Sequence, residues 1–152
     1  MGNWVITQFL NTVFWNVLRF IWSWLIYTWG GLHRYFGNQN KMPSEHEHAI
    51  RYFARAYEVD PRFWQARVAR AVLLWRELDR PQEAIEEFDA LLADDPHCGP
   101  ALFNRAMAMQ KVGRFRESLA DFEAYLELPE QQVYDQADAA RMVLLLRDLL
   151  GE

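Results

Sequence analysis

The feature that most constrains this sequence is an internal repeat of 34 to 35 residues. The stretch AIRYFARAYEVDP at 49–61 aligns with AIEEFDALLADDP at 84–96 at an offset of 35. SLADFEAYLELPE at 118–130 continues the pattern at an offset of 34. The segments between these stretches match as well, ARVARAVLL at 66–74 with ALFNRAMAM at 101–109. Self-similarity at a fixed period of this length indicates a repeat architecture, in which each unit packs only against its neighbours.

These repeats resemble the tetratricopeptide repeat, a helix-turn-helix unit of 34 residues, and the resemblance covers residues 44 to about 130. The small, aromatic and turn positions of that pattern are filled by Ala71, Ala106, Ala84, Ser118, Phe88, Phe122, Gly113 and Pro96. Small residues let the two helices of a unit approach closely, and the aromatic residue fills the gap to the next helix. Asp79 departs from the pattern, because glycine is usual at its position.

The resemblance implies an all-α fold, a short helix-turn-helix solenoid over residues 44–150. It contains about two and a half repeats, and the first repeat is expected to lack its first helix. We expect helices at 44–59, 63–78, 81–94, 98–112 and 115–128, followed by a capping helix at 132–150 that covers the exposed end of the stack.

A tetratricopeptide-like stack implies binding of a protein or peptide along the surface formed by the first helix of each unit. The residues at the family's groove positions are Val68, Val72, Trp75, Phe103, Asn104 and Met107. This set is mainly apolar, so it favours an amphipathic or apolar helix as the ligand. The alternative is that these side chains pack against the protein's own residues 30–43 or against its N-terminal helix.

The N-terminal segment differs in composition from the repeats. Five of the seven tryptophans lie in the first 29 residues, where Arg19 is the only charged side chain. As a helix, residues 4–29 would reach about 39 Å, against a hydrocarbon core of about 30 Å. The sequence therefore predicts a single transmembrane anchor over residues 1–30 and a linker over 31–43, which contains Gly31 and Gly37.

One side of the N-terminal helix is polar. Its members are Gln8, Thr12, Asn16, Arg19 and Ser23. In a spanning helix, these residues are expected to contact another protein within the membrane. Two alternatives stay open: an amphipathic helix lying in the membrane surface, and a pigment- or cofactor-contacting subunit of a bioenergetic complex, in which His33 and the tryptophans contact the ligand.

Charge and composition indicate the location and the classes of function. Basic residues, among them Arg34 and Lys41, outnumber acidic ones in residues 1–80, whereas acidic residues outnumber basic ones in 81–152. Because basic residues follow the N-terminal helix and none precedes it, we expect the C-terminal domain to be cytoplasmic. The basic residues form no run, which argues against nucleic-acid binding.

No arrangement of residues indicates catalysis, a metal, a cofactor or a small-molecule substrate. His46 and His48 lie two residues apart and point to different sides of a helix, and no base accompanies Cys98. The predicted function is a membrane-anchored protein-interaction module, serving as a scaffold, assembly factor or accessory subunit of a membrane protein complex. Its expected partners are subunits of that complex and membrane lipid.

Overall fold

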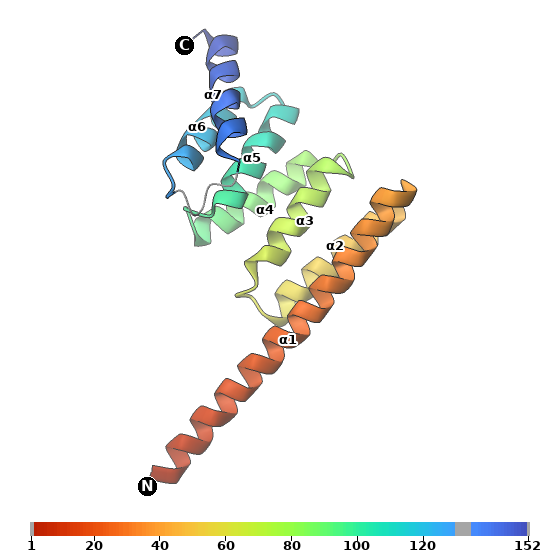
Figure 1. The fold of residues 1–152 in the computed structure, drawn as a ribbon, viewed down its shortest axis with the longest axis vertical. Helices are drawn as coiled ribbons and strands as arrows, with labels where there is room; N and C mark the ends of the chain where they lie inside the picture. The colour runs from red at the N-terminus through yellow and green to blue at the C-terminus, as the bar shows by residue number, and fades with distance from the viewer. Residues whose placement is uncertain (1, 130–134, 152) are drawn as a thin grey trace. The chain divides into compact units, whose positions relative to one another are not determined.

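The computed structural model describes residues 2–129 and 135–151, and in the first helix it describes the side chains of residue 8 and of residues from 10 onward. The described residues form seven α-helices (Figure 1). These are α1 (Gly2–Asn40), α2 (Pro43–Val59), α3 (Trp64–Arg76), α4 (Pro81–Asp94), α5 (Gly99–Lys111), α6 (Phe115–Leu126) and α7 (Gln136–Leu150). The all-α class is confirmed.

The helices α2 to α6 begin and end within two residues of the ranges expected from the sequence. Proline stands at the first turn of α2 and α4, where its missing N–H removes no helical hydrogen bond. Gly113 follows α5 with φ +77°, a left-handed conformation that favours glycine. For the last helix, α7 begins at Gln136, and residues 132–134 of the expected range lie outside the described residues.

The prediction of a transmembrane anchor is wrong, and so is the single-pass location derived from it. Within the described part of the chain, no helix combines the length and the apolar character needed to cross a membrane. With 39 residues α1 is long. However, its glutamine, asparagine and threonine side chains and Arg19 lower its mean hydropathy, and tryptophan and tyrosine add less than aliphatic residues do.

Residues 31–40, which were expected to form part of a linker, are helical. They continue α1 to Asn40, where Lys41 takes a left-handed conformation with φ 52° and the Met42 N–H donates to the Gly37 carbonyl oxygen at 3.0 Å. α2 then runs back along α1, and the two helices form an antiparallel hairpin (Figure 1). The C-terminal part of α1 is therefore the first helix of the first repeat, which was expected to be missing.

Small residues on one side of α1 allow this close packing. Ser23, Gly30 and Gly37 are spaced by seven residues and are buried. A methyl group added to Gly37 would lie 2.4 Å from the His46 ring, and one added to Gly30 would lie 2.8 Å from the Phe53 ring. Glycine is costly within a helix, but here it admits the side chains of the opposite helix.

The chain divides into two compact units, residues 1–70 and 71–152, with the boundary inside α3. In the N-terminal unit, Ala56, Phe63 and Ala66 form a core with the partly buried Ile26 and Tyr27. In the C-terminal unit, α4, α5, α6 and α7 pack in sequence order. The residues at the small and aromatic repeat positions are fully buried there: Ala71, Ala84, Phe88, Ala106, Ser118 and Phe122.

An ion-pair network joins three helices of the C-terminal unit. The Arg105 guanidinium on α5 donates to both carboxylate oxygens of Asp121 on α6, at 2.7 and 2.6 Å, and to Asp89 on α4 at 2.7 Å. These bonds raise the pKa of Arg105 above its ordinary value, with the hydrogen bond to Asp121 as the main cause. Because Asp121 is buried, the arginine neutralises a charge that would otherwise be costly in this position.

Candidate functional site

The structure brings four of the six predicted groove residues together in the C-terminal unit. Trp75 on α3 and Phe103, Asn104 and Met107 on α5 line one open cleft of about 520 Å³. Val72 belongs to the same unit but does not line this cleft, and Val68 belongs to the N-terminal unit. We call this site the α3–α5 cleft.

Contacts behind the α3–α5 cleft fix its apolar side chains. The Phe103 ring packs at steep angles against Phe122 and Tyr125, with ring centres 5.5 and 5.4 Å away. Lys111 lies over the Trp75 ring at 5.8 Å and donates to the Trp75 carbonyl oxygen at 2.8 Å. Phe103 and Trp75 are therefore held in place by their own unit, and the exposed parts of the mostly buried Trp75 and the partly buried Phe103 form a preformed apolar lining.

Polar and charged groups form the edge of the α3–α5 cleft. The Asn104 Nδ2 donates to the Pro100 carbonyl oxygen at 2.8 Å, and Lys111 forms an ion pair with Asp79 at 3.3 Å. Arg76 and Glu77, at the end of α3, and Asp135 and Asp138, at the start of α7, complete the lining. These four residues and Lys111 were not predicted from the sequence, because they lie outside the groove positions that the repeat resemblance supplies.

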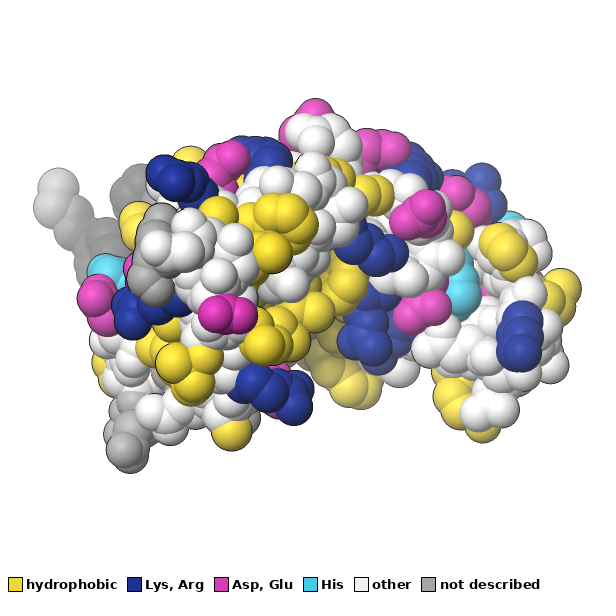
Figure 2. Space-filling view, turned by 90° about the horizontal axis from the view of Figure 1, so that it is seen from above, with side chains coloured by type: hydrophobic (Ala, Val, Ile, Leu, Met, Phe, Trp, Pro, Cys, Tyr) yellow, Lys and Arg dark blue, Asp and Glu magenta, His cyan; other side chains and the backbone are white. Residues whose placement is uncertain are grey.

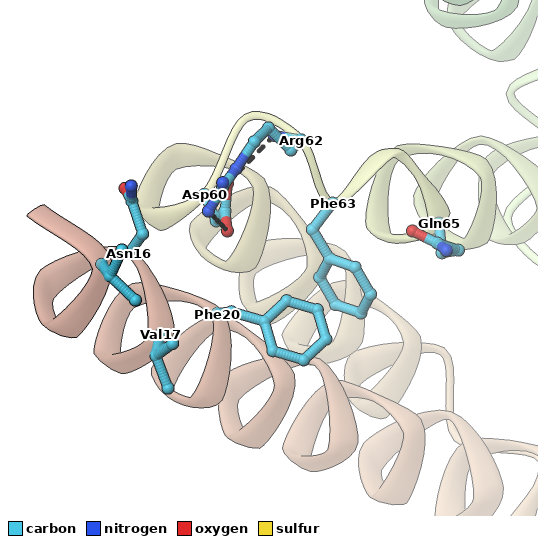
Figure 3. A pocket seen from close by; sticks show the side chains of 8 residues that line it. Asn16, Val17, Phe20, Asp60, Arg62, Phe63 and Gln65 are labelled. Atoms are coloured by element: carbon cyan, nitrogen blue, oxygen red, sulfur yellow. Dashed lines mark hydrogen bonds and ion pairs between the residues drawn. The ribbon is translucent and has the colours of Figure 1, made fainter. Parts of the chain in front are cut away.

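A second open cleft, of about 500 Å³, lies in the N-terminal unit (Figure 3). The Phe20 and Phe63 rings meet edge to face there, 6.2 Å apart, and Val17 lies beside them. Asp60 and Arg62 form the polar side, where the guanidinium donates to the carboxylate at 2.9 and 2.8 Å. These bonds lower the pKa of Asp60, and the charge of Arg19 adds a smaller effect in the same direction.

The five residues predicted to contact a membrane partner do not form one exposed side of α1. Ser23 is buried in the hairpin, where its hydroxyl donates to the Ala56 carbonyl oxygen at 2.7 Å. Asn16 lines the second cleft. Gln8, Thr12 and Arg19 are exposed, and the Thr12 hydroxyl donates to the Gln8 carbonyl oxygen at 2.9 Å. The polar side of this helix therefore serves partly to pack the protein's own hairpin.

His33, which the cofactor alternative invokes, lies in a cluster within the hairpin. Its Nδ1 is 2.7 Å from Glu45 Oε2, and its ring stacks on those of His48 and Tyr52. Trp29 meets it edge to face at 6.3 Å. These contacts hold the ring between α1 and α2.

Large apolar side chains are exposed along α1, outside the side of the helix that carries its polar residues and packs on α2. We call this set the α1 apolar surface: Leu10, Val13, Phe14, Trp15, Val17, Leu18, Phe20, Ile21, Trp22, Trp24, Leu25, Trp29, Leu32, Tyr35 and Phe36. Single exposed apolar residues are ordinary on protein surfaces, but a contiguous set of this extent marks a surface of interaction.

No protein-family model matches the chain. Among curated proteins, it is similar to a UDP-N-acetylglucosamine–peptide N-acetylglucosaminyltransferase from Giardia intestinalis, with 29% identity over 99 residues. The match covers 65% of this chain but only 7% of that protein. Because 99 of 152 residues are matched, the match includes α3 and α4 wherever it begins. The similarity therefore concerns the tetratricopeptide-like helices and does not bear on enzymatic activity.

Proposed function

We propose that the protein is a tetratricopeptide-like interaction module that binds a segment of a partner protein in the α3–α5 cleft. The observation that carries this proposal is the convergence of Trp75, Phe103, Asn104 and Met107, from two first helices of the repeats, on one cleft. The proposal is binding without catalysis. The similar protein from Giardia intestinalis is named for transfer of a sugar to peptides, an activity that this proposal does not include.

The chemistry of the α3–α5 cleft indicates the kind of segment that fits. The Trp75, Phe103 and Met107 side chains suit an apolar residue, and the Asp135 and Asp138 carboxylates suit a basic residue beside it. Acidic residues outnumber basic ones by about two to one in residues 71–152. This excess attracts a basic segment from a distance and raises its association rate, most strongly at low salt.

Selection from a displayed library of random 12-residue peptides tests the cleft. We expect enriched peptides to combine a large apolar residue with lysine or arginine. Met107→Glu is expected to weaken their binding at least about tenfold in fluorescence polarisation, because it places a charge among apolar side chains. Ala90→Glu adds the same charge at an exposed position on α4, outside the cleft, and is the control. Equal binding by the two variants would refute the site.

The α1 apolar surface supports a second role, as an accessory subunit that attaches to a larger protein complex. An apolar helix surface as broad as that of α1 is normally buried against other protein, and in-plane membrane helices carry a broad charged side that α1 lacks. We expect Trp15→Lys with Trp22→Lys to reduce the partner protein recovered by affinity purification. Trp64→Lys, at an exposed tryptophan on α3, is the control.

Flotation with vesicles of phosphatidylcholine and phosphatidylglycerol separates this role from the in-plane alternative. A protein partner predicts that the purified protein stays with the soluble fraction. Flotation of the wild-type protein, together with loss of flotation in the double tryptophan variant, would replace the protein partner with a lipid surface.

A further inference from the structure

The outer side of α7, the last helix of the described residues, is apolar. Ala139, Val143 and Leu146 are buried and face the rest of the unit. On the other side, Leu144, Leu145 and Leu149 are 69%, 57% and 61% exposed. No helix among the described residues covers them. Apolar side chains also lie at the surface among acidic and basic ones in the space-filling view (Figure 2).

Charged residues of opposite sign lie between these leucines. Arg141 and Asp148 are seven residues apart, so they fall almost on one line along the helix. Leu144 and Leu145 lie on either side of that line, each about 50° from it, at 100° per residue. Arg141 and Asp148 are also equally far, along the helix axis, from the point midway between Leu144 and Leu145.

This pattern is complementary to itself. If two copies of α7 lie antiparallel with their centres between Leu144 and Leu145, Arg141 of each copy meets Asp148 of the other. Leu144 of each copy then meets Leu145 of the other, and the two-fold symmetry makes every contact twice. No like charges meet in this arrangement.

Arg141 is available for such a contact. It forms an ion pair with Asp138 at 2.8 Å, but both side chains are more than half exposed, and an exposed pair three residues apart on a helix contributes little. Asp148 is exposed and forms no ion pair with any described residue. Exchanging the Arg141–Asp138 ion pair for an intermolecular pair with Asp148 therefore costs little free energy.

We propose that α7 pairs antiparallel with α7 of a second copy of this chain and so forms a symmetric homodimer. A helix of 15 residues is about 22 Å long at 1.5 Å per residue, so the interface is smaller than that of a permanent dimer. The dimer is accordingly weak, and weaker at high salt.

Charge reversal tests the pairing in sedimentation equilibrium of the full chain. Arg141→Asp puts four carboxylates at the interface, and Asp148→Arg puts four guanidinium groups there. We expect each variant to dissociate at least about tenfold more readily than the wild-type protein, because two attractive pairs become repulsive. An equal mixture of the two variants is expected to form heterodimers, and the double variant Arg141→Asp/Asp148→Arg to form homodimers.

Arg55→Asp is the matched control, because Arg55 also belongs to an exposed ion pair three residues apart, with Glu58 at 3.0 Å. It is expected to dimerise like the wild-type protein. Circular dichroism checks that every variant is folded. A wild-type protein that stays monomeric at about 500 μM would overturn the proposal. So would dimerisation that the charge reversals leave unchanged, since another surface would then join the copies. Peptide binding in the α3–α5 cleft is measured separately, so failure of either proposal is distinguishable.

Discussion

Two glycines of α1 allow a direct test of the α1–α2 hairpin. Gly31 and Gly37 lie in the same helix, but a methyl group at Gly31 would meet nothing within 4 Å, whereas one at Gly37 would lie 2.4 Å from the His46 ring. That ring is 5% exposed and its Nε2 forms a hydrogen bond with Asn38 Oδ1 at 2.9 Å. It therefore has little room to move.

The same substitution is expected to have opposite effects at these two positions. Gly31→Ala is expected to stabilise the hairpin by about 0.5–1 kcal/mol through the higher helix propensity of alanine. Gly37→Ala has the same gain, but forcing the His46 ring aside costs about 1–3 kcal/mol, and the lost hydrogen bond about 0.5–1.5 kcal/mol. The net result is destabilisation by about 0.5–4 kcal/mol.

Urea unfolding followed by tryptophan fluorescence measures this difference. Six of the seven tryptophans lie in residues 1–70, so the signal reports mainly on the N-terminal unit. Gly30→Ala is a second test, because its methyl group would lie 2.8 Å from the Phe53 ring. If Gly37→Ala were as stable as Gly31→Ala, the close packing of α1 on α2 would be refuted, and residues 31–43 would behave as a linker.

Two further predictions concern buried carboxylates. The lowered pKa of Asp60 stabilises the folded state above about pH 4 and this contribution is lost as the pH falls through the folded-state pKa. In urea unfolding, the difference in unfolding free energy between the wild-type protein and Asp60→Asn should therefore be constant from about pH 5 to 7 and shrink below about pH 4. A difference that does not change with pH would contradict this prediction. Arg105→Met leaves the Asp121 carboxylate buried without its partner and is expected to cost about 3–5 kcal/mol in thermal unfolding. The double variant Arg105→Met/Asp121→Leu should recover most of this loss, and a double variant no more stable than Arg105→Met would show that the buried charge is not the cause.

The repeat region could be predicted from the sequence because its pattern is a packing requirement. Ala71, Ala84 and Ala106 recur where two helices touch, and Phe88 and Phe122 where a gap is filled, and all five are fully buried. The same register identified Trp75, Phe103, Asn104 and Met107 of the α3–α5 cleft. Periodicity carries this information because the residues that touch lie at fixed helical spacing.

The α1–α2 hairpin could not be predicted from propensity. Gly30, Gly31 and Gly37 indicate the end of a helix when propensity alone is considered, yet the gain from close packing outweighs their cost in the structure. A usable signal was present: Ser23, Gly30 and Gly37 follow one another at intervals of seven, which places small residues on one side of a helix. Gly37 also lies 34 residues before Ala71, in register with the repeat.

The repeat pattern alone could not predict the charged edge of the α3–α5 cleft or the exposed leucines of α7. Asp135 and Asp138 reach the cleft because α7 packs on α6, and a repeat pattern that ends near residue 130 does not supply that contact.

Arg19 has a different environment from the one expected from the sequence. In a spanning helix it would need a partner protein, whereas in the structure it is exposed and its charge acts on Asp60 across the hairpin.

The continuity of α1 has a mechanical consequence. One helix of 39 residues contains both the part packed on α2 and the part that carries Trp15 and Trp22, with no break between them. The directions in which these tryptophans point are therefore fixed by how α1 is rotated about its own axis where it packs on α2. Inserting one alanine near residue 17 would turn Trp15 by about 100° relative to Trp22 and α2, and inserting seven would return Trp15 to nearly its original direction, about 10 Å further out. The one-residue insertion changes mainly the direction of Trp15, and the seven-residue insertion changes mainly its distance from α2. Comparing partner binding by the two variants therefore shows whether a partner that contacts both parts of α1 depends on the direction of Trp15 or on its distance.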